Sequence, residues 1–229
     1  MIKLIDYKEN PITHCGKIAG LCWGANTEDD EKNFKRGLEC IQNNHGRVME
    51  YADITVEISE YSARVIRELY THIIGTSRLQ ESTRYVDCSD LGYYIPPSIK
   101  VNPTAKEMYE DCIANIMETY SKLLDLGVKK EDVANLLPLG SHTKVVLKIN
   151  LRALINLFHL RLCTRAYIEF RHLMIELKKQ LRPLSKEWEL LCDEMFVPKC
   201  INMGYCDEKY SCGLKPKKEH IEIVSTNIK

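Results

Sequence analysis

The segment GTSRLQESTRY, residues 75–85, contains two arginines, a glutamine, a glutamate and several hydroxyl groups but little apolar surface. Guanidinium and hydroxyl groups donate hydrogen bonds to anions, and arginine can bind a phosphate with two parallel bonds. Ser82 and Arg84 are therefore candidates for holding an anionic ligand, and Gln80 lies two positions before Ser82. We expect this segment to bind a substrate.

A second polar set lies in NLRALINLFHLRLCTRAYIEFR, residues 150–171. Its spacing predicts a helix over 150–181, about 32 residues and on the order of 48 Å long. Asn150 and Arg161 are eleven positions apart, which is three turns, so both would face the same side of that helix. Asn150 could instead cap the helix, and Arg161 could pair with a carboxylate in an oligomer interface. Packed against Ser82 and Arg84, Arg161 would complete a phosphate site.

Ten cysteines are spread from Cys15 to Cys212, a distribution that favours reduced thiols over a disulfide scaffold in a chain of this length. Four of them fall within 21 residues near the C-terminus, at Cys192, Cys200, Cys206 and Cys212. Four thiolates can hold a structural Zn²⁺ or an iron–sulfur cluster. Unligated packing and surface thiols are the alternative, because spacing alone supports the metal.

Helices and strands alternate along the chain and must position these residues. The segment 51–59 alternates, with Ile54, Val56 and Ile58 on one face, as a half-buried strand does. KVVLKI, residues 144–149, predicts another strand.

Helices are predicted over 28–44, from near Ser59 to Gly75, from Pro103 to Gly127, and over 131–137. Residues 93–95 predict a strand that ends at Pro96-Pro97, where a helix is not expected. These elements indicate one continuous fold over 1–181 and a cysteine-rich extension over 182–229.

The overall charge excludes a general attraction to nucleic acid, because the 229 residues carry 32 Lys+Arg and 32 Asp+Glu. No segment has the apolar run of a signal peptide or of a membrane span, so we expect a cytoplasmic protein with neither nucleic acid nor a membrane as partner.

The motifs STRY, residues 82–85, and the run 150–171 resemble those of the flavin-dependent thymidylate synthases. That family has an Arg-His-Arg triplet, seven residues, a Ser, an Arg two positions later and a Tyr, followed later by an Asn-x-Arg-x-Leu run that ends in Leu-Arg. The matching residues here are Ser82, Arg84, Tyr85, Asn150, Arg152, Leu154, Asn156, Leu160, Arg161, Ala166 and Glu169.

The resemblance implies an α+β fold, with an antiparallel sheet packed with long helices, in a homotetramer. It implies reductive methylation of dUMP to dTMP, with methylenetetrahydrofolate as carbon donor, FAD as hydride carrier and NADPH as reductant. By this resemblance Gln80, Ser82 and Arg84 bind the nucleotide, with Ser82 at the reacting centre and Arg161 on the uracil or phosphate side.

The flavin would be bound by Asn150 and Asn156, while the family's triplet is not intact. Counting back seven residues from Ser82 gives His72-Ile73-Ile74, and one deleted residue gives Thr71-His72-Ile73. Either way both arginines are missing, and isoleucine offers neither charge nor donor. Arg47 and Arg78 are the candidates to replace them, and His72 is a further candidate for binding the cofactor. Two alternatives remain open: a flavin-dependent paralogue that modifies pyrimidine nucleotides differently, and a non-catalytic nucleotide-binding protein on the same scaffold.

Overall fold

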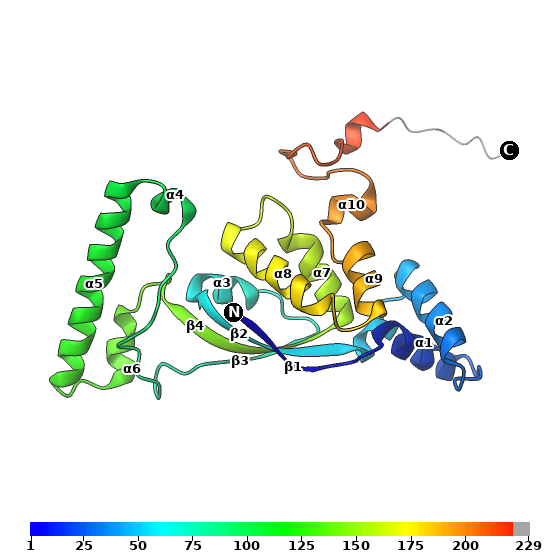
Figure 1. Cartoon of the computed structure of the whole chain (residues 1–229), viewed down its shortest axis with the longest axis horizontal. Coiled ribbons are helices and arrows are strands. Elements are labelled where there is room, and N and C mark those ends of the chain that lie inside the picture. Colours follow the sequence, from blue (N-terminus) through cyan, green and yellow to red (C-terminus); the bar gives the residue numbers. More distant parts are fainter. Residues whose placement is uncertain (222–229) are drawn as a thin grey trace. The chain divides into compact units, whose positions relative to one another are not determined.

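The computed structural model describes residues 1–221, and the chain folds into two compact units. Unit 1 consists of residues 1–7 and 53–150, and unit 2 consists of residues 8–52 and the chain from 151 onward. The chain thus enters unit 1, leaves it and returns (Figure 1).

Unit 1 is built on an antiparallel sheet of four strands. These are β1 (Ile2–Tyr7), β2 (Asp53–Ser62), β3 (Thr76–Gln80) and β4 (His142–Asn150). The strand order β1-β2-β4-β3 leaves β3 at one edge. The helices of this unit are α3 (Ala63–Leu69), α4 (Pro97–Lys100), α5 (Pro103–Asp125), α6 (Lys130–Val133) and the 3-10 helix η2 (Ala134–Leu136).

The central strand β2 confirms the predicted alternation, since Ile54, Val56 and Ile58 are fully buried. It continues to Ser62, however, so the helix expected from Ser59 starts only at Ala63. The Ser62 hydroxyl accepts a hydrogen bond from Val65 N at 3.2 Å and caps α3 there.

Pro97 opens α4, which corrects the expectation that Pro96-Pro97 would exclude a helix. Proline is tolerated in the first turn, where its missing N–H has no helical partner to lose. Of the strand expected over 93–95, only Tyr93 makes an isolated bridge, to Ser141. The next helix, α5, forms as predicted, with Asn102 as its cap.

Unit 2 is helical in its described part. Its elements are α1 (Pro11–Cys22), α2 (Asp30–Gln42), η1 (Val48–Tyr51), α7 (Leu151–Arg161), α8 (Ile168–Leu181), α9 (Lys186–Glu194), α10 (Lys199–Met203) and η3 (Lys218–His220). The predicted helix over 28–44 is confirmed as α2, and α1 was not predicted.

Two glycines let α1 and α2 cross at very short distance. A Cβ added to Gly16 would lie 1.8 Å from the Asn33 carbonyl oxygen, and one added to Gly37 would lie 2.0 Å from that of Ile12. The buried Glu187 of α9 then accepts hydrogen bonds from Ile12 N at 2.6 Å and Thr13 N at 3.0 Å, so it satisfies the first turn of α1.

The single helix predicted over 150–181 is wrong. Asn150 is the last residue of β4, and the helix is interrupted between Arg161 and Ile168. Ala166 N bonds back to Cys163 O at 3.0 Å, so a turn replaces the helical ladder. Asn150 and Arg161 therefore do not share a helix face.

The predicted α+β class with an antiparallel sheet is confirmed, and about half of the chain is helical. The proposed boundary at 181/182 stays a prediction, and residues 222–229 of that extension lie outside the described part. No helix in residues 1–221 combines the length and apolarity needed to cross a bilayer.

Candidate functional site

The segment 70–85, here called the edge segment, runs from the end of α3 through the edge strand β3 into the loop that follows it. Its strand pairs with β4 from Thr76, opposite Ile149, to Gln80, opposite Val145. The sequence did not predict β3, because TSRLQ has few of the apolar residues that define a half-buried strand.

Ser82 begins the turn at the far end of the edge segment. Its carbonyl oxygen accepts hydrogen bonds from Tyr85 N and Val86 N, each at 3.1 Å, and its hydroxyl accepts one from Arg84 N at 3.3 Å. Gln80 Nε2 donates to Thr143 Oγ1 at 3.2 Å. The three predicted nucleotide residues of unit 1 therefore follow one another along a strand end and a turn.

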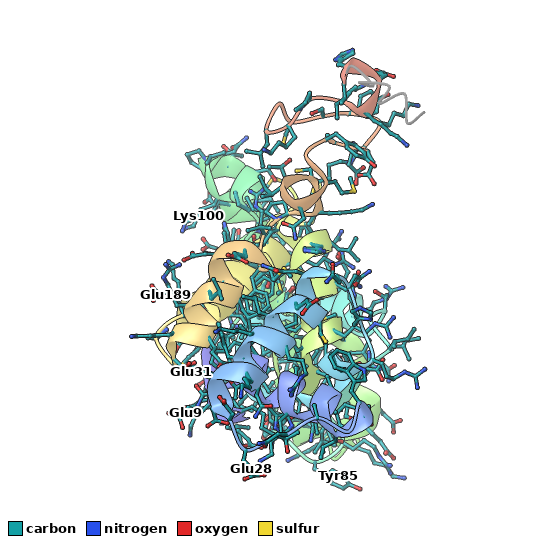
Figure 2. The ribbon with its side chains drawn as sticks, turned by 90° about the vertical axis from the view of Figure 1, so that its right-hand side faces the viewer. Glu9, Glu28, Glu31, Tyr85, Lys100 and Glu189 are labelled. Atoms are coloured by element: carbon teal, nitrogen blue, oxygen red, sulfur yellow. The ribbon has the colours of Figure 1, made fainter. Side chains whose placement is uncertain are left out.

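Arg84 is held at the surface by one carboxylate. Its Nε lies 2.7 Å from Glu131 Oε2 of α6, and 64% of its side chain remains exposed. The guanidinium also lies over the Tyr85 ring, 5.8 Å from its centroid, and Tyr85 itself extends away from the ribbon (Figure 2). An exposed ion pair contributes roughly 0–1 kcal/mol. Arg84 can therefore exchange Glu131 for an anionic ligand at small cost.

A cavity of about 120 Å³ lies beside this turn. Its walls include Gln80 and Thr83 from the edge segment, Ala134 and Pro138 from the stretch after α6, and His142 at the start of β4. Burial lowers the pKa of His142 below its usual value, so its imidazole is neutral at pH 7. The cavity thus offers hydrogen-bonding groups without a formal positive charge on His142.

At the other end of the edge segment, Arg78 is fixed by backbone carbonyls. Its Nη1 donates to Tyr70 O at 2.8 Å and to His72 O at 3.1 Å, and the guanidinium lies 4.8 Å from the centroid of the Tyr70 ring. Asn150 lies at the same end, because a Cβ on Gly75 would be 2.6 Å from Asn150 Nδ2. The His72 carbonyl, the Arg78 guanidinium and the Asn150 amide therefore lie at the same end of the edge segment.

Ile73 and Ile74, which follow His72 where the family has its Arg-His-Arg triplet, are at the surface. Ile73 is 70% exposed and Ile74 is 85% exposed. They present apolar surface where the family pattern has charge.

Unit 2 presents two more predicted residues on its surface. Arg47 is exposed and has no ion-pair partner among residues 1–221. Asn156 is exposed on α7, one turn after Arg152, whose Nη1 lies 2.7 Å from Glu50 Oε1. Arg152 matched the family motif but received no predicted role. Its guanidinium contacts Glu50 and lies beside Gly46, so it joins α7 to the segment 46–50.

Arg161 is the last residue of α7 and stacks over the Phe170 ring at 4.6 Å from its centroid. The cation is half-buried against this ring in unit 2, whereas Ser82 and Arg84 belong to unit 1.

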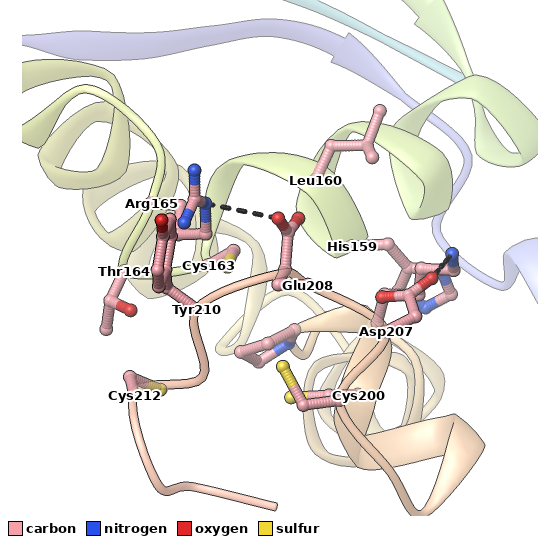
Figure 3. A pocket seen from close by; sticks show the side chains of 13 residues that line it. His159, Leu160, Cys163, Thr164, Arg165, Cys200, Asp207, Glu208, Tyr210 and Cys212 are labelled. Atoms are coloured by element: carbon pink, nitrogen blue, oxygen red, sulfur yellow. Dashed lines mark hydrogen bonds and ion pairs between the residues drawn. The ribbon is translucent and has the colours of Figure 1, made fainter. Parts of the chain in front are cut away.

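The four C-terminal cysteines predicted as metal ligands do not all lie at the same place. Cys200, Cys206 and Cys212 line a cavity of about 180 Å³, together with Cys163 from the break between α7 and α8 (Figure 3). Cys192 is not among the lining residues, because it is fully buried in α9 with its thiol 3.7 Å from Lys178 O. In residues 1–221, no group of three or more Cys, His, Asp or Glu side chains is placed so that it could hold a metal ion without rearrangement.

A comparison with protein families shows what the chain is related to. A family profile described as "Thymidylate synthase complementing protein" matches residues 3–185, which is most of the chain. The chain belongs to this family.

Curated relatives match most of the chain. A flavin-dependent thymidylate synthase of Pyrococcus furiosus is 30% identical over 91% of this chain and 89% of its own length. The enzyme named for Pyrococcus abyssi is 33% identical over 72% of this chain and 69% of its own length. That of Pyrococcus horikoshii is 31% identical over 91% of this chain and 90% of its own length. The predicted family and the predicted enzyme class are confirmed.

Proposed function

We propose that this family member methylates dUMP at C5 of the uracil ring to give dTMP, using methylenetetrahydrofolate, FAD and NADPH. The observation that carries the proposal is the Gln80–Ser82–Arg84 segment, in which an exposed arginine with one carboxylate partner lies next to a cavity that Gln80, Thr83 and His142 line together with apolar residues. The similarity to flavin-dependent thymidylate synthases supports the same activity.

The nucleotide residues act by binding and orientation. Arg84 would replace its Glu131 partner with the phosphate of the nucleotide, and the Ser82 hydroxyl, already aligned by Arg84 N, would hold the reacting part of the substrate. Arg161, with one face on Phe170, would add a second cation for the uracil or the phosphate. No nucleophilic cysteine is required on this scheme, because fixed polar groups stabilise charge that develops on the ring.

The residues at the α3 end of the edge segment fit a flavin dinucleotide. Arg78 uses Nη1 for two carbonyls, and its Nε and Nη2 donate to no acceptor among the described residues, so its planar fork remains suited to a phosphate. Asn150 and His72 lie beside it, and Arg47 and Asn156 are exposed polar groups of unit 2. When bound, FAD supplies the hydride that completes the methyl group.

We further propose that four copies assemble, as the family resemblance implies, and that the enzyme works in the cytoplasm. Leu79, with 74% of its surface exposed on the edge strand, and the exposed Ile73 and Ile74 give the edge segment apolar side chains that a second copy would cover.

Product analysis tests the function. Full-length protein, dUMP, NADPH and methylenetetrahydrofolate labelled with carbon-13 at the methylene are incubated without oxygen, and the nucleotides are analysed by mass spectrometry. We expect labelled dTMP, and the protein as purified should show the absorption of oxidised flavin. A different labelled nucleotide would favour the paralogue.

Thermal melting with dUMP separates the remaining outcomes. At 100 times its Kd a ligand adds about 2.7 kcal/mol, which raises the Tm of a chain of this size by roughly 5 °C or more. A colourless protein that is stabilised by dUMP but makes no dTMP would be a non-catalytic nucleotide-binding protein. No shift with millimolar dUMP, together with no product, would reject every one of these functions.

A further inference from the structure

Unit 2 contains four cysteines that come from three separate parts of the chain and face one cavity. Cys163 lies in the break between α7 and α8, Cys200 lies on α10, and Cys206 and Cys212 lie in the stretch that follows α10. Figure 3 shows the side chains of Cys163, Cys200 and Cys212 around the same space. We propose that Cys163, Cys200, Cys206 and Cys212 are the four ligands of a structural Zn²⁺ ion.

The four thiols are near neighbours as well as lining residues of one cavity. Cys200 interacts electrostatically with Cys206, Cys163 and Cys212. Thiolates gathered at short distance repel one another, and a divalent cation placed among them removes that repulsion.

Cys212 lies against the segment that carries Cys163. Its thiol has hydrogen bonds with the Thr164 hydroxyl and the Leu214 N–H. The contact with Thr164 places Cys212 beside the residue that follows Cys163. Neither Cys163 nor Cys212 belongs to a helix or strand, and the proposal requires that their side chains rotate to bring the four sulfurs around the ion.

The backbone that carries Cys206 is fastened on both sides. Cys206 N donates to Pro216 O at 2.7 Å, and Lys218 N donates to Cys206 O at 3.3 Å. The next two residues form ion pairs with other walls of the cavity, Asp207 with Lys199 of α10 and Glu208 with Arg165, where Nε and Oε2 are 3.1 Å apart. These contacts hold the second half of the ligand set against the first, as outer contacts of metal sites do.

The charge of the site is also accounted for. Four Zn–S bonds form as four S–H bonds break, the protons pass to solvent, and no electron is transferred. The resulting centre has a net charge of about −2, the sum of Zn²⁺ and four thiolates. Arg165 and Lys199 line the same cavity, each paired with a carboxylate that also lines it, so these four side chains add no further net charge.

Cys192, which the spacing of the sequence grouped with the other three, is excluded from the ligand set. Burial raises its pKa to about 11, and its thiol faces the Lys178 carbonyl in the interior. Cys163 takes its place, although 37 positions separate it from Cys200 in the sequence.

Metal content tests the proposal in the intact enzyme. Untagged full-length protein, made in zinc-supplemented medium, should contain about one zinc per chain, with little iron and no acid-labile sulfide. Replacement of zinc by Co²⁺ should give the long-wavelength absorption of a cobalt tetrathiolate, beyond the flavin bands. Protein without stoichiometric zinc that takes up no cobalt overturns the proposal, and so does iron with equivalent sulfide.

Four variants identify the ligands. Cys163→Ser and Cys212→Ser should lose the zinc, whereas Cys192→Ser and Cys112→Ser, the latter an exposed thiol on α5, should keep it. Loss of zinc in Cys192→Ser with retention in Cys163→Ser would overturn the ligand set. If a ligand variant does not fold, the wild type is titrated with Co²⁺ and the alkylation of each cysteine is measured. Bound metal must then protect Cys163 from alkylation and leave Cys112 reactive, and an unprotected Cys163 overturns the ligand set.

Discussion

The edge segment of unit 1 holds Arg84 at the surface with a single carboxylate partner, whereas unit 2 gathers thiols into a partly buried cavity. Arg84 has one carboxylate at 2.7 Å and is mostly exposed. In the cavity, each thiol lies among other thiols, which oppose the ionisation of Cys200. An exposed cation can exchange its weak ion-pair partner for a substrate that binds reversibly. A cluster of ionised thiols, by contrast, is stable only when a tightly bound cation offsets the repulsion between them.

The two regions also differ in their relation to the family. Every residue of the edge segment lies inside the matched stretch 3–185, whereas three of the four thiols lie beyond it. We therefore expect substitutions in the first region to change substrate and cofactor binding, and substitutions in the second to change metal content and stability.

The largest effect is expected for Arg84→Gln on catalysis. A hydrogen bond to a charged group is worth about 1.5–3 kcal/mol, so kcat/KM for dUMP should fall roughly tenfold to hundredfold. The Tm should hardly change, because the ion pair with Glu131 is exposed. Steady-state kinetics and melting curves measure both, with Lys144→Gln as the control, since Lys144 is a neighbouring exposed cation paired with Glu81. Equal losses in both variants would mean that general charge, and not Arg84, matters.

Next in size is the effect of Arg78→Ala on FAD. Loss of the guanidinium should weaken FAD binding by about tenfold or more, as measured by fluorescence titration. Arg67→Ala, which removes an exposed cation from α3, is the matched control. Tight FAD binding that is indifferent to both Arg78→Ala and Arg47→Ala would show that other groups hold the diphosphate.

A smaller effect is expected in the reactivity of the thiols after zinc removal. Because its pKa is lowered, Cys212 is more ionised at neutral pH than Cys200, whose pKa is raised, and should be alkylated first. Thr164→Val removes a hydrogen bond to the thiolate, raises the Cys212 pKa and should slow that reaction several-fold at pH 7. Peptide mass spectrometry follows each cysteine, and the exposed Cys112 serves as an internal reference. A Cys200 that reacts before Cys212 would contradict the electrostatic ordering.

The smallest effect is expected for Glu208→Gln. This change weakens the exposed pair with Arg165, so the Tm should fall by less than about 4 °C. Zinc should remain bound but leave faster to a chelator, whereas Glu219→Gln, which weakens an exposed pair with Lys217, should leave zinc release unchanged. Identical rates of zinc release in the two variants would show that Glu208 does not help to retain the metal.

Periodicity was sufficient for the elements whose burial follows a simple pattern. Ile54, Val56 and Ile58 alternate and are buried, and α2 follows from its helical spacing. The edge strand β3 was not predictable in this way, because its partner β4 is more than sixty residues away and supplies the pairing. The break after Arg161 was hidden for a related reason, since no glycine or proline marks it and tertiary contacts stabilise the turn.

Motif matching predicted the nucleotide residues but could not predict which thiols meet. Gln80, Ser82 and Arg84 lie within a stretch of five residues, so any local structure keeps them close. Cys163 joins the other thiols only because α10 and the following stretch fold back to the end of α7. Sequence spacing therefore favoured Cys192 as a ligand, but Cys192 is buried on α9 and does not face the cavity.

The crossing of α1 and α2 has a consequence for how these sequences change over evolutionary time. Any side chain at Gly16 or Gly37 would enter the backbone of the opposite helix, so selection must keep both positions free of a Cβ whatever the enzyme binds. Invariance of these two glycines among relatives would report the shape of a helix pair rather than catalysis. In an alignment of relatives, the most conserved positions of this region would then carry no information about the reaction.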